Sequence, residues 1–411
     1  MKRREFLSKT GAAGSALILA QLGQESAQAR ALGDEQIDPA LNAIPDPTKT
    51  QGAGVSKLGA RSPHESIERL PLFNVISGTP LHKLSGSITP SDLHFERHHA
   101  GIPSIDPNHH ELLIHGMVNK PLKFTLSDLK RFPSVTRTCF IECSGNFYAR
   151  ATPETSVQML CGLTSQSEWT GVALSTLLRE VGVQSKATWL LAEGSDAAVM
   201  TRSIPMSKAL DDALVVYAQN GEPLRPAQGY PIRLLLPGWE GNTNIKWIRR
   251  IEVSDSPFMT REETAKYTDA LPNGTARQFS VVMDTRSVIT SPTFPAQIEP
   301  GWNEISGIAW SGRGRIADVE ISTDDGATWQ KAQLKGAVLA KAHTRFGFMW
   351  NWNGKPTVIM SRAIDETGNA QPTLASLLKV RGTPTLEAYH FNPIQAWSVD
   401  SGGQMRFRPE L

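Results

Sequence analysis

Cysteine is scarce in this sequence of 411 residues, and the cysteines that occur lie close together. Cys139, Cys143 and Cys161 are the only three. No framework of disulfides can therefore span the fold, and the odd number leaves at least one thiol unpaired. The pattern CxxCH is missing, so we expect no c-type haem attached to this chain. One short stretch thus holds every thiol available for packing or for chemistry.

The sequence also lacks an excess of one charge and long apolar runs. Lys and Arg number 42 against 40 Asp and Glu, a formal net charge of +2, which gives no reason to expect nucleic acid or a membrane surface as a partner. Beyond the first residues, no stretch approaches the ~18 apolar residues of a membrane span. The composition, with 40% hydrophobic and 20% charged residues, is that of a globular protein long enough for two domains with extensions.

The first residues have the features of an export signal rather than of a folded element. Arg3 and Arg4 form an arginine pair, a weakly apolar stretch covers 11–22, and small residues precede a cleavage site after Ala29. Gly and Ser interrupt the apolar stretch, which favours the twin-arginine system over an ordinary Sec signal. Because that system exports proteins already folded, often around a cofactor, we predict a signal peptide at 1–29 and a periplasmic mature protein.

The remaining chain shows two different patterns. Residues 30–92 are rich in Pro, Gly, Ser and isolated charges without a sustained period, which indicates an extended arm. Over residues 93–275, short apolar stretches typical of strands alternate with a few helical stretches, such as 174–181, which Gly182 ends. Long irregular connections join these stretches. We therefore predict an α+β domain rather than a regular alternation of strands and helices.

An all-β pattern begins at about residue 276. Short stretches of β-forming residues lie between Gly, Asp and Asn turns. The strands that we expect are 279–283, 301–309, 316–322, 328–332 and 358–364. This spacing predicts a β-sandwich of immunoglobulin type over residues 276–400, followed by a C-terminal tail at 401–411.

The strongest local signal for chemistry is the run CFIECSGN at residues 139–146. A strand that ends at Cys143 and enters a Ser-Gly-Asn turn can expose its sulfur, and a thiolate is a good soft ligand for a metal. The alternative is a buried, inert core cysteine, and the strand and turn alone do not exclude it. Cys139 shares the same face of the strand, so we expect it to pack in the core. Cys161 has no distinguishing context.

The second signal is the run FERHHAGIP at residues 95–103, which places Arg97 beside His98 and His99. This set can grip an anion or ligate a metal. A further histidine pair follows at 109–110, but no CxxC or HxxxH partner is present to complete a zinc site. A solvated polar loop is the alternative.

The third signal is the run PGWEGNTNIKW at residues 237–247, which follows an apolar strand at 232–236. Its glycines permit close approach of the backbone, and Lys246 is placed to meet a phosphate. It is not a Walker loop, because the GK[ST] ending is missing. A glycine-rich turn with a surface lysine is the alternative.

Taken in this order, the motifs resemble the sulfite oxidase family of molybdopterin oxidoreductases, over about residues 90–400. In that family the cysteine that coordinates molybdenum lies in a C-[AS]-G-N turn, and the cofactor loop ends in K-W. The matches in this chain are the CSGN turn at 143–146, the RHH run at 97–99 with Pro103, the K-W pair at 246–247, Tyr267 some twenty residues on, and Arg345 before the WNW run at 350–352.

The resemblance implies a molybdopterin cofactor whose molybdenum takes Cys143 as its protein ligand. It implies that Arg97 and Arg345 supply fixed donors to the substrate and that Tyr267 donates a hydrogen bond and assists proton movement. The residues that it implies in cofactor binding are His99, Ser144, Asn146, Arg233, Asn242, Asn244 and Lys246. It also implies dimerisation through the β-sandwich.

Two departures from the family bear on the substrate. Sulfite oxidases usually have two arginines directly after the C-[AS]-G-N turn, where this chain has Phe147 and Tyr148. They also have a tryptophan at about the position of Ser165. Loss of a cation and of a bulky ring predicts a pocket that is less selective for anions and more open. We therefore expect a larger substrate, namely sulfane sulfur on a cysteine of a carrier protein.

Within the family, the sequence resembles most the molybdenum subunit of Sox-type sulfane dehydrogenases. That resemblance implies periplasmic oxidation of sulfane sulfur during thiosulfate and sulfur oxidation. Electrons would pass to a separate c-type cytochrome, in a homodimer or a heterotetramer with that cytochrome. The alternative is a sulfite:cytochrome c dehydrogenase that oxidises free sulfite to sulfate. A nitrate or methionine sulfoxide reductase on the same domain, or a carrier without enzymatic activity, are further alternatives.

Overall fold

The computed structural model describes residues 51–148, 150–382 and 389–409. The chain divides into two compact units, Met1–Ser66 and Ile67–Leu411. Within the first unit, the described residues 51–66 contain no helix or strand. The predicted twin-arginine signal at 1–29 lies outside the described residues.

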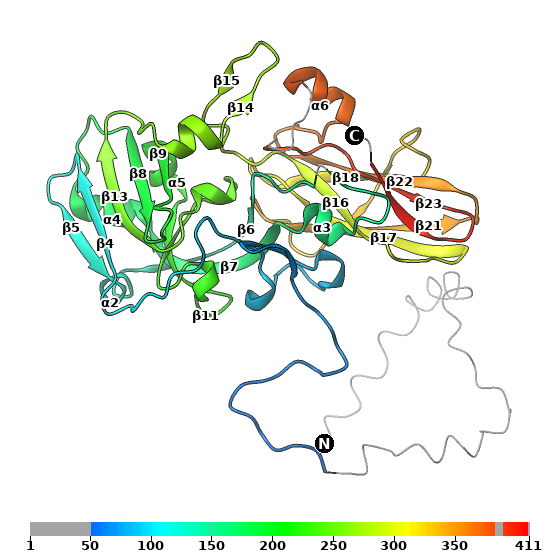
Figure 1. The fold of residues 1–411 in the computed structure, drawn as a ribbon, viewed down its shortest axis with the longest axis horizontal. Helices are drawn as coiled ribbons and strands as arrows, with labels where there is room; N and C mark the ends of the chain where they lie inside the picture. The colour runs from blue at the N-terminus through cyan, green and yellow to red at the C-terminus, as the bar shows by residue number, and fades with distance from the viewer. Residues whose placement is uncertain (1–50, 149, 383–388, 410–411) are drawn as a thin grey trace, which may run out of the picture. The chain divides into compact units, whose positions relative to one another are not determined.

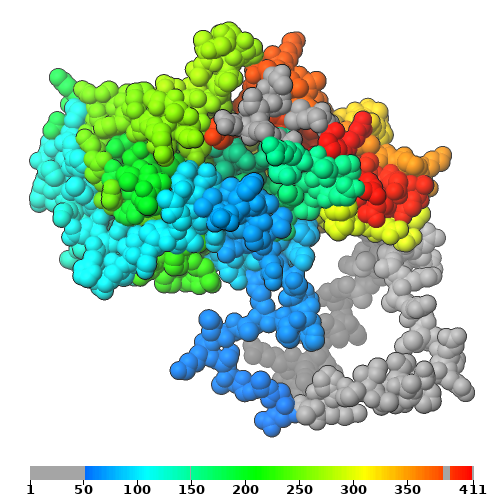
Figure 2. Space-filling view, in the orientation of Figure 1, coloured from blue at the N-terminus to red at the C-terminus, as the bar shows by residue number. Residues whose placement is uncertain are grey.

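The second unit opens with a small antiparallel sheet of β1 (Leu70–Phe73), β2 (Ile76–Gly78) and β3 (Glu96–Arg97). The first two strands lie in the stretch predicted to be an extended arm, so the chain pairs with itself from residue 70 onward. Figure 2 shows these first residues of the unit, in blue, at the centre of the visible face. Its third strand, β3, contains Glu96 and Arg97 of the FERHH run.

Two further sheets follow (Figure 1); one contains β6, which leads into the CSGN turn, and the loop 237–247 runs from one sheet to the other. Their strands are β4 (Glu111–Gly116), β5 (Leu122–Thr125), β6 (Ser134–Glu142), β7 (Thr164–Ala173), β8 (Trp189–Gly194), β9 (Thr201–Pro205), β10 (Leu214–Gln219), β11 (Glu222–Pro223), β12 (Arg233–Leu235) and β13 (Ile248–Ser254). One sheet has the order β5-β4-β13-β8-β9, in which β4 and β13 are parallel. The other has the order β11-β10-β7-β6, and β12 pairs with β10. Short helices complete an α+β domain: α2 (Leu126–Leu129), α3 (Val157–Cys161), α4 (Leu174–Val181) and α5 (Met206–Asp211).

The helix α4 forms where the sequence predicts it. It ends at Gly182, whose φ of 67° is a left-handed conformation that glycine adopts without a steric penalty. Its apolar residues are spaced so that one face is buried against the sheets. That face consists of Leu174, Leu177, Leu178 and Val181.

After residue 285 the chain forms two antiparallel sheets that share one hydrophobic core. The strands are β16 (Arg286–Ser291), β17 (Gly301–Trp310), β18 (Ile316–Ser322), β19 (Gln330–Lys331), β20 (Gln333–Lys335), β21 (Thr344–Trp352), β22 (Thr357–Asp365), β23 (Ala396–Val399) and β24 (Met405–Arg408). The first sheet has the order β16-β17-β21-β20 and the second the order β19-β18-β22-β23-β24. We refer to this region as the C-terminal β-sandwich.

Two details of this region differ from the sequence prediction. No strand covers 279–283, where Val282 forms only an isolated bridge with Trp239. At the other end, β24 pairs with β23, so the sheet continues into the stretch predicted to be a tail. The helix α6 (Leu374–Arg381) lies between β22 and β23 in the chain. None of the helices in the described ranges is both long and apolar enough to span a bilayer.

Buried polar groups join the C-terminal β-sandwich to the strand that precedes Cys143. Glu142 is 1% exposed, and its carboxylate accepts hydrogen bonds from Trp310 Nε1 at 2.6 Å and from Arg286 Nη1 at 3.0 Å. Burial raises the pKa of this carboxyl group, whereas the Arg286 guanidinium acts in the opposite direction. Because a buried carboxylate depends on these partners, the end of β6 and the turn after it are held against the sandwich.

His343 forms a second buried junction of the same two regions. Its Nε2 lies 2.9 Å from Thr164 Oγ1 of β7, and its ring stacks on Phe140 with 5.7 Å between centroids. Burial, with a smaller contribution from Arg345, lowers the pKa of His343 to about 3. The unfolded chain protonates this histidine below pH 6.5, but the folded protein does not until about pH 3. Stability is therefore expected to fall as the pH drops below 6.5.

We predict that His343→Gln makes the protein less sensitive to acid. Between pH 6.5 and pH 5 this one histidine should remove about 2 kcal/mol of stability, and glutamine can keep a hydrogen bond to Thr164 without titrating. Urea denaturation at pH 7.5 and pH 5.0 measures the difference. His109→Gln, at a side chain that is 85% exposed, controls for loss of an imidazole. An unchanged pH dependence in the His343 variant would contradict the prediction.

Candidate cofactor site

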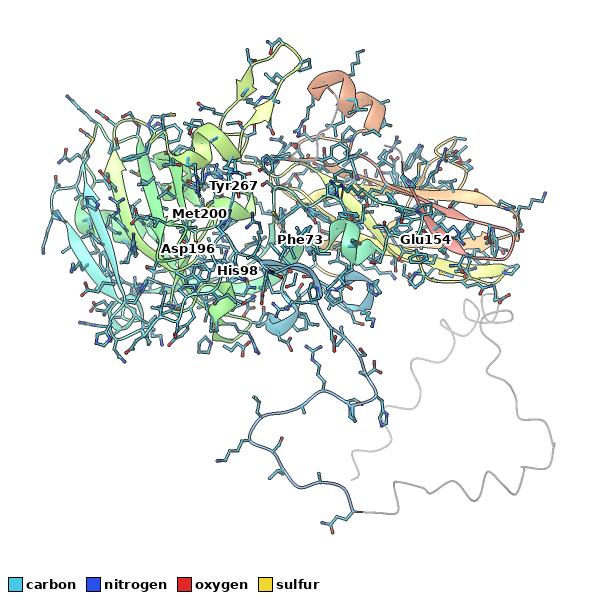
Figure 3. All side chains as sticks on the ribbon, in the orientation of Figure 1. Phe73, His98, Glu154, Asp196, Met200 and Tyr267 are labelled. Carbon is cyan, nitrogen blue, oxygen red and sulfur yellow. The ribbon has the colours of Figure 1, made fainter. Side chains whose placement is uncertain are left out.

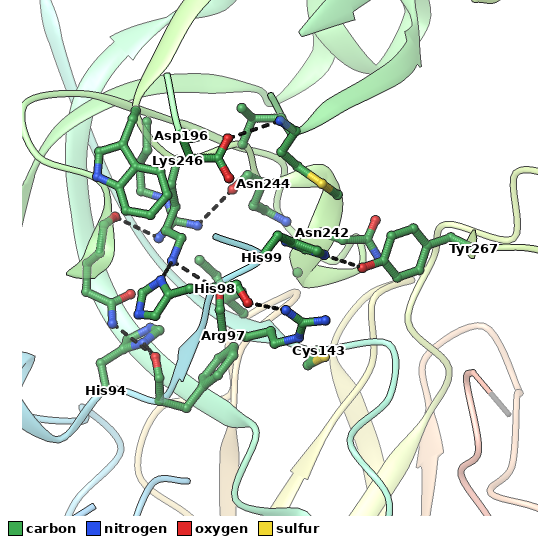
Figure 4. Close-up of a pocket in the computed structure, with 18 residues that line it drawn as sticks. His94, Arg97, His98, His99, Cys143, Asp196, Asn242, Asn244, Lys246 and Tyr267 are labelled. Atoms are coloured by element: carbon green, nitrogen blue, oxygen red, sulfur yellow. Dashed lines mark hydrogen bonds between the residues drawn. The ribbon is translucent and has the colours of Figure 1, made fainter. Parts of the chain in front are cut away.

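The three sequence motifs meet at one cavity in the second unit. It has about 680 Å³ of empty space, including its open mouth. Figure 3 labels His98, Asp196, Met200 and Tyr267, all of which line the cavity. Figure 4 shows the lining side chains at close range.

Each motif reaches the cavity from the end of a strand. Arg97 ends β3, Cys143 follows β6 directly, and the loop 237–247 connects β12 to β13. This loop passes close to the cysteine strand, because a Cβ on Gly241 would lie 2.8 Å from the carbonyl oxygen of Glu142. Glycine is therefore needed at 241 for the loop and the cysteine turn to line the same cavity.

The sulfur of Cys143 lies at the cavity wall beside Arg97 (Figure 4). Burial raises the pKa of the Cys143 thiol, whereas the Gly145 N–H and the charge of Arg97 act in the opposite direction. A cysteine binds metal as the thiolate, so the adjacent cation favours the ligand form. Cys139 and Cys161 are buried elsewhere and do not line the cavity.

Positive charge predominates among the lining residues. Arg97, Arg233 and Lys246 are the cations, and Asp196 is the one carboxylate among the described lining residues. Burial lowers the pKa of Arg233 to about 9, and burial together with the charge of Arg233 lowers the pKa of Lys246 well below its ordinary value. Buried cations that lack matching carboxylates are costly. An anionic ligand would remove that cost.

Lys246 is held by three uncharged acceptors, one for each N–H of its ammonium group. Its Nζ donates to His98 Nδ1 at 2.7 Å, to the Arg97 carbonyl at 3.2 Å and to the Ala227 carbonyl at 3.1 Å. Because Nδ1 of His98 accepts, its Nε2 carries the proton and donates to Glu96 at 3.3 Å. Burial lowers the pKa of His98 and favours this neutral imidazole. His98, which the sequence analysis grouped with Arg97 and His99 as an anion or metal site, thus orients Lys246.

Three buried polar atoms of lining residues have no hydrogen-bond partner within the described part of the chain. They are Nε2 of His94, Nε of Arg233 and Oδ1 of Asn242. Buried polar atoms are nearly always satisfied, so these atoms indicate a ligand with donors and acceptors of its own. A molybdopterin would provide a phosphate for the cations, a pterin ring for these atoms and a metal for the Cys143 sulfur. The residues present therefore fit that cofactor.

Tyr267 and His99 lie together at the cavity. The phenol oxygen is 2.9 Å from His99 Nε2. Burial and the charge of Arg97 lower the pKa of His99 to about 3, and burial raises the pKa of Tyr267. Both groups are therefore neutral at pH 7, and the phenol keeps a proton to donate. Tyr267 directly follows the π-helical turn η7 (Glu262–Lys266), a type of turn that occurs often at functional sites.

Ser144 and Asn146 do not line the cavity. The Ser144 hydroxyl accepts a hydrogen bond from Asn242 Nδ2 at 3.1 Å. The Asn146 amide donates to Glu142 at 3.0 Å and accepts the Leu163 N–H at 2.9 Å. Both atoms of the Asn146 amide are thus engaged within the protein. These two residues shape the cysteine turn instead of offering donors to a cofactor.

Asn244 and Arg345 also differ from the sequence prediction. Asn244 lines the cavity, but its amide accepts the Leu236 N–H at 2.7 Å and donates within its own loop. Arg345 is outside the cavity: it lies in β21 and donates to the carbonyls of Leu84, at 2.7 Å, and Gly86. Its partners are backbone groups, so the structure gives it the role of fixing that loop.

The two departures noted in the sequence do not widen the cavity. Ser165 is fully buried, 2.6 Å from Thr79 Oγ1 and hydrogen-bonded to the Phe95 N–H. Phe147 and Tyr148 lie on the other side of the turn, where Phe147 packs on a ring of the C-terminal segment. The expected opening at these positions is therefore wrong, because their side chains face other parts of the core.

The histidine pair at 109–110 likewise lies apart from the cavity. His109 is exposed and pairs with Asp106 at 3.2 Å, and His110 is buried against the Ile248 carbonyl. Within the residues that the structure describes, no three or more His, Cys, Asp or Glu side chains are grouped to hold a metal ion. Among the lining residues, His94, Asp196, Met200 and Gln228 were not predicted. Only His94, which lies beside the FERHH run, had a signal in the sequence.

Comparison with known proteins agrees with this site. The family model for an oxidoreductase molybdopterin-binding domain matches residues 99–262, and that for a Mo-co oxidoreductase dimerisation domain matches residues 277–396. The sulfane dehydrogenase SoxCD from Paracoccus pantotrophus superposes with a TM-score of 0.87 and 42% sequence identity, over 92% of this chain and 100% of that chain.

More distant relatives include enzymes of two activities. Mitochondrial sulfite oxidase from Rattus norvegicus is 30% identical over 333 residues, which cover 72% of this chain and 59% of that protein. Nitrate reductase [NADH] from Ulva prolifera is 29% identical over 358 residues, which cover 76% of this chain and 41% of that protein. The chain thus spans only part of the length of these two relatives. It belongs to the sulfite oxidase family of molybdopterin oxidoreductases, with a molybdopterin-binding domain followed by a dimerisation domain.

Proposed function

We propose that this protein oxidises sulfane sulfur on a cysteine of a carrier protein and passes the electrons to a separate c-type cytochrome. The observation that supports this proposal is a cationic cavity around Cys143 in a chain 42% identical to a sulfane dehydrogenase over that chain's full length. When bound, the molybdenum cofactor supplies oxygen transfer to sulfur and takes up two electrons. The protein supplies the thiolate ligand, the charge and the orientation.

The cavity divides into a part for the cofactor and a part for the substrate. Arg233 and Lys246 would bind the phosphate, and the unpartnered atoms of His94 and Asn242 would meet the pterin. Cys143 would ligate the metal. Among the described residues that line the cavity, Arg97 is the one cation that these assignments leave unused.

The charge left for the substrate favours a carrier-bound sulfur. Among the described lining residues, Arg97 is the one cation beside Cys143, since Arg345 lies outside the cavity and is bound to a loop. A single fixed guanidinium can orient a polarised sulfur, whereas a free dianion is better bound by several cations. Tyr267 would keep a proton at its phenol oxygen and could donate it to the substrate.

Free sulfite is the second candidate, and one structural observation favours it. Neither Ser165 nor Phe147 and Tyr148 line the cavity, so they provide no extra room for a cysteine of a carrier protein. The 30% identity to a sulfite oxidase points to the same substrate. A sulfite:cytochrome c dehydrogenase is therefore the alternative to be tested.

The location and the assembly belong to the same proposal. The arginine pair at positions 3 and 4 supports twin-arginine export to the periplasm. The C-terminal β-sandwich matches a family model named for dimerisation, which supports a homodimer or a heterotetramer with the cytochrome. We take this sandwich to be of immunoglobulin type. We also propose that the haem that accepts the electrons is on the partner cytochrome rather than on this chain.

The deciding experiment compares two substrates with one electron acceptor. Purified molybdenum-loaded protein is mixed with its partner cytochrome and either free sulfite or a carrier protein that bears a cysteine-bound sulfane. We expect cytochrome reduction with the carrier-bound sulfane to exceed that with sulfite by at least about tenfold in kcat/KM. Protein prepared without molybdenum is the control and should be inactive. Faster turnover of sulfite would replace the proposal with the alternative, and no turnover of either would reject both.

A further inference from the structure

A buried ion cluster lies directly behind Tyr267, outside the cavity. Arg202, in β9, is 0% exposed. Its Nη1 donates to Glu240 and its Nε to Glu263, each at 2.7 Å. Its guanidinium carbon is 5.1 Å from the centre of the Tyr267 ring. The arginine is thus oriented by two carboxylates while it lies against the face of an aromatic ring that lines the cavity.

The cluster connects the segments that form the site. Glu240 belongs to the loop that bears Asn242 and Lys246, and Glu263 lies in η7, four residues before Tyr267. His390 approaches from the C-terminal region: its Nε2 lies 3.2 Å from Glu240, and its backbone N–H donates to the Ser144 carbonyl at 2.9 Å. One arginine therefore links the cofactor loop, the turn before Tyr267 and, through Glu240, the cysteine turn.

The two carboxylates of the cluster both face Arg202, and Glu240 also faces His390. Burial alone would lower the pKa of His390, but the hydrogen bond and the charge of Glu240 raise it above the ordinary value. Removal of Arg202 from this buried set would leave buried negative charge without its cationic partner. A substitution at Arg202 therefore has to keep the positive charge if the fold is to be preserved.

We propose that Arg202 is a positioning residue for Tyr267. By lying against the tyrosine ring, Arg202 holds the phenol beside His99 and Cys143. The His99 hydrogen bond at 2.9 Å fixes only the phenol oxygen. A second contact on the ring is needed to fix its plane, and Arg202 provides it, with Tyr389 packed on the same ring at 5.1 Å between centroids. The inference rests on the proposed function only where turnover is concerned.

Arginine is specifically suited to this task. A planar guanidinium can donate along two edges to Glu240 and Glu263 while its face lies on the ring. The lysine ammonium is a point charge that can pair with the carboxylates but cannot present a flat face. Arg202→Lys therefore keeps the positive charge and removes the geometry, whereas Arg202→Met would leave Glu263 without its arginine partner and Glu240 with His390 alone, and so endanger folding.

The first test observes the ring itself. With 3-fluorotyrosine incorporated at position 267 alone, the ¹⁹F resonance should shift or broaden in Arg202→Lys, both with and without the cofactor. Arg362→Lys is the matched control, because Arg362 also pairs with a glutamate, Glu320, and lies over a tryptophan ring at 4.3 Å, far along the chain. It should leave the resonance unchanged. Glu240→Gln, which loosens Arg202 at the same volume, serves as a second variant if Arg202→Lys does not fold, and it should move the resonance too.

The second test separates positioning from a merely structural role. We expect Arg202→Lys to lower kcat about tenfold with KM nearly unchanged, and to have almost no further effect in a Tyr267→Phe background. Full additivity of the two substitutions, or an unmoved ¹⁹F resonance in a folded variant, would overturn the inference. If the wild-type protein oxidises no sulfur compound, the proposed function fails, but the resonance still decides whether Arg202 positions Tyr267.

Discussion

Cys143→Ser should abolish sulfur oxidation without unfolding the protein. Cys143 is the one cysteine at the cavity wall in the described part of the chain. A serine hydroxyl is a hard, protonated group and a poor substitute for a soft thiolate ligand. We expect kcat to fall at least about 1,000-fold, equivalent to about 4 kcal/mol of transition-state stabilisation. Steady-state kinetics, with the bound molybdenum determined in the same samples, measures the loss.

A second cysteine provides the control for this experiment. Cys139 is 1% exposed and packs in a hydrophobic cluster four residues earlier on the same strand. Cys139→Ala should keep activity within about twofold and reduce stability by about 1 kcal/mol, as a small core truncation does. If Cys143→Ser retained a tenth of the activity or more, Cys143 would not be the molybdenum ligand. If both variants lost activity equally, the effect would come from the strand rather than from the thiolate.

Lys246→Met should release the cofactor. Methionine resembles lysine in length but carries no charge, so the variant removes one of the cations that line the cavity. Hydrogen bonds to charged groups contribute about 1.5–3 kcal/mol, which predicts a loss of about 10–100-fold in affinity. The measurement is the amount of molybdenum and pterin that stays with the purified protein after extensive dialysis.

Lys208→Met is the matched variant for this prediction. Lys208 is buried, donates to the Pro237 carbonyl at 2.8 Å and lies over Trp239 at 5.4 Å, as Lys246 lies over Trp247 at 4.5 Å. It does not line the cavity. The Lys208 variant should be less stable yet retain its cofactor. Retention of a full complement of cofactor by Lys246→Met would exclude the phosphate-binding role of Lys246.

Local features of the sequence were sufficient wherever neighbouring residues decide the structure. The helix 174–181 has an apolar face and a terminal glycine, and both act within two turns of the chain. The turn after β6 and the loop 237–247 have residue types that determine where the backbone can bend or approach another strand. The resemblance of these motifs to the sulfite oxidase family pointed to Cys143, Arg97, Lys246 and Tyr267, which the structure places at one cavity.

The tertiary structure decided which way individual side chains point. Arg345 has the residue type and the place in the sequence for a substrate contact, but the carbonyls of Leu84 and Gly86 bind it, more than 250 residues earlier in the chain. Ser165 likewise faces Thr79 instead of the cavity.

Sequence motifs could not predict the cluster behind Tyr267 either, because only the tertiary structure brings its members together. Arg202, Glu240, Glu263 and His390 are separated by 23 to 188 positions and share no pattern. The sequence by itself thus determined the family, the order of the motifs and the local backbone around them. Burial and hydrogen bonding between distant segments determined which polar groups serve the cavity and which support it, because a buried side chain points to the partner that satisfies its charge or its donors.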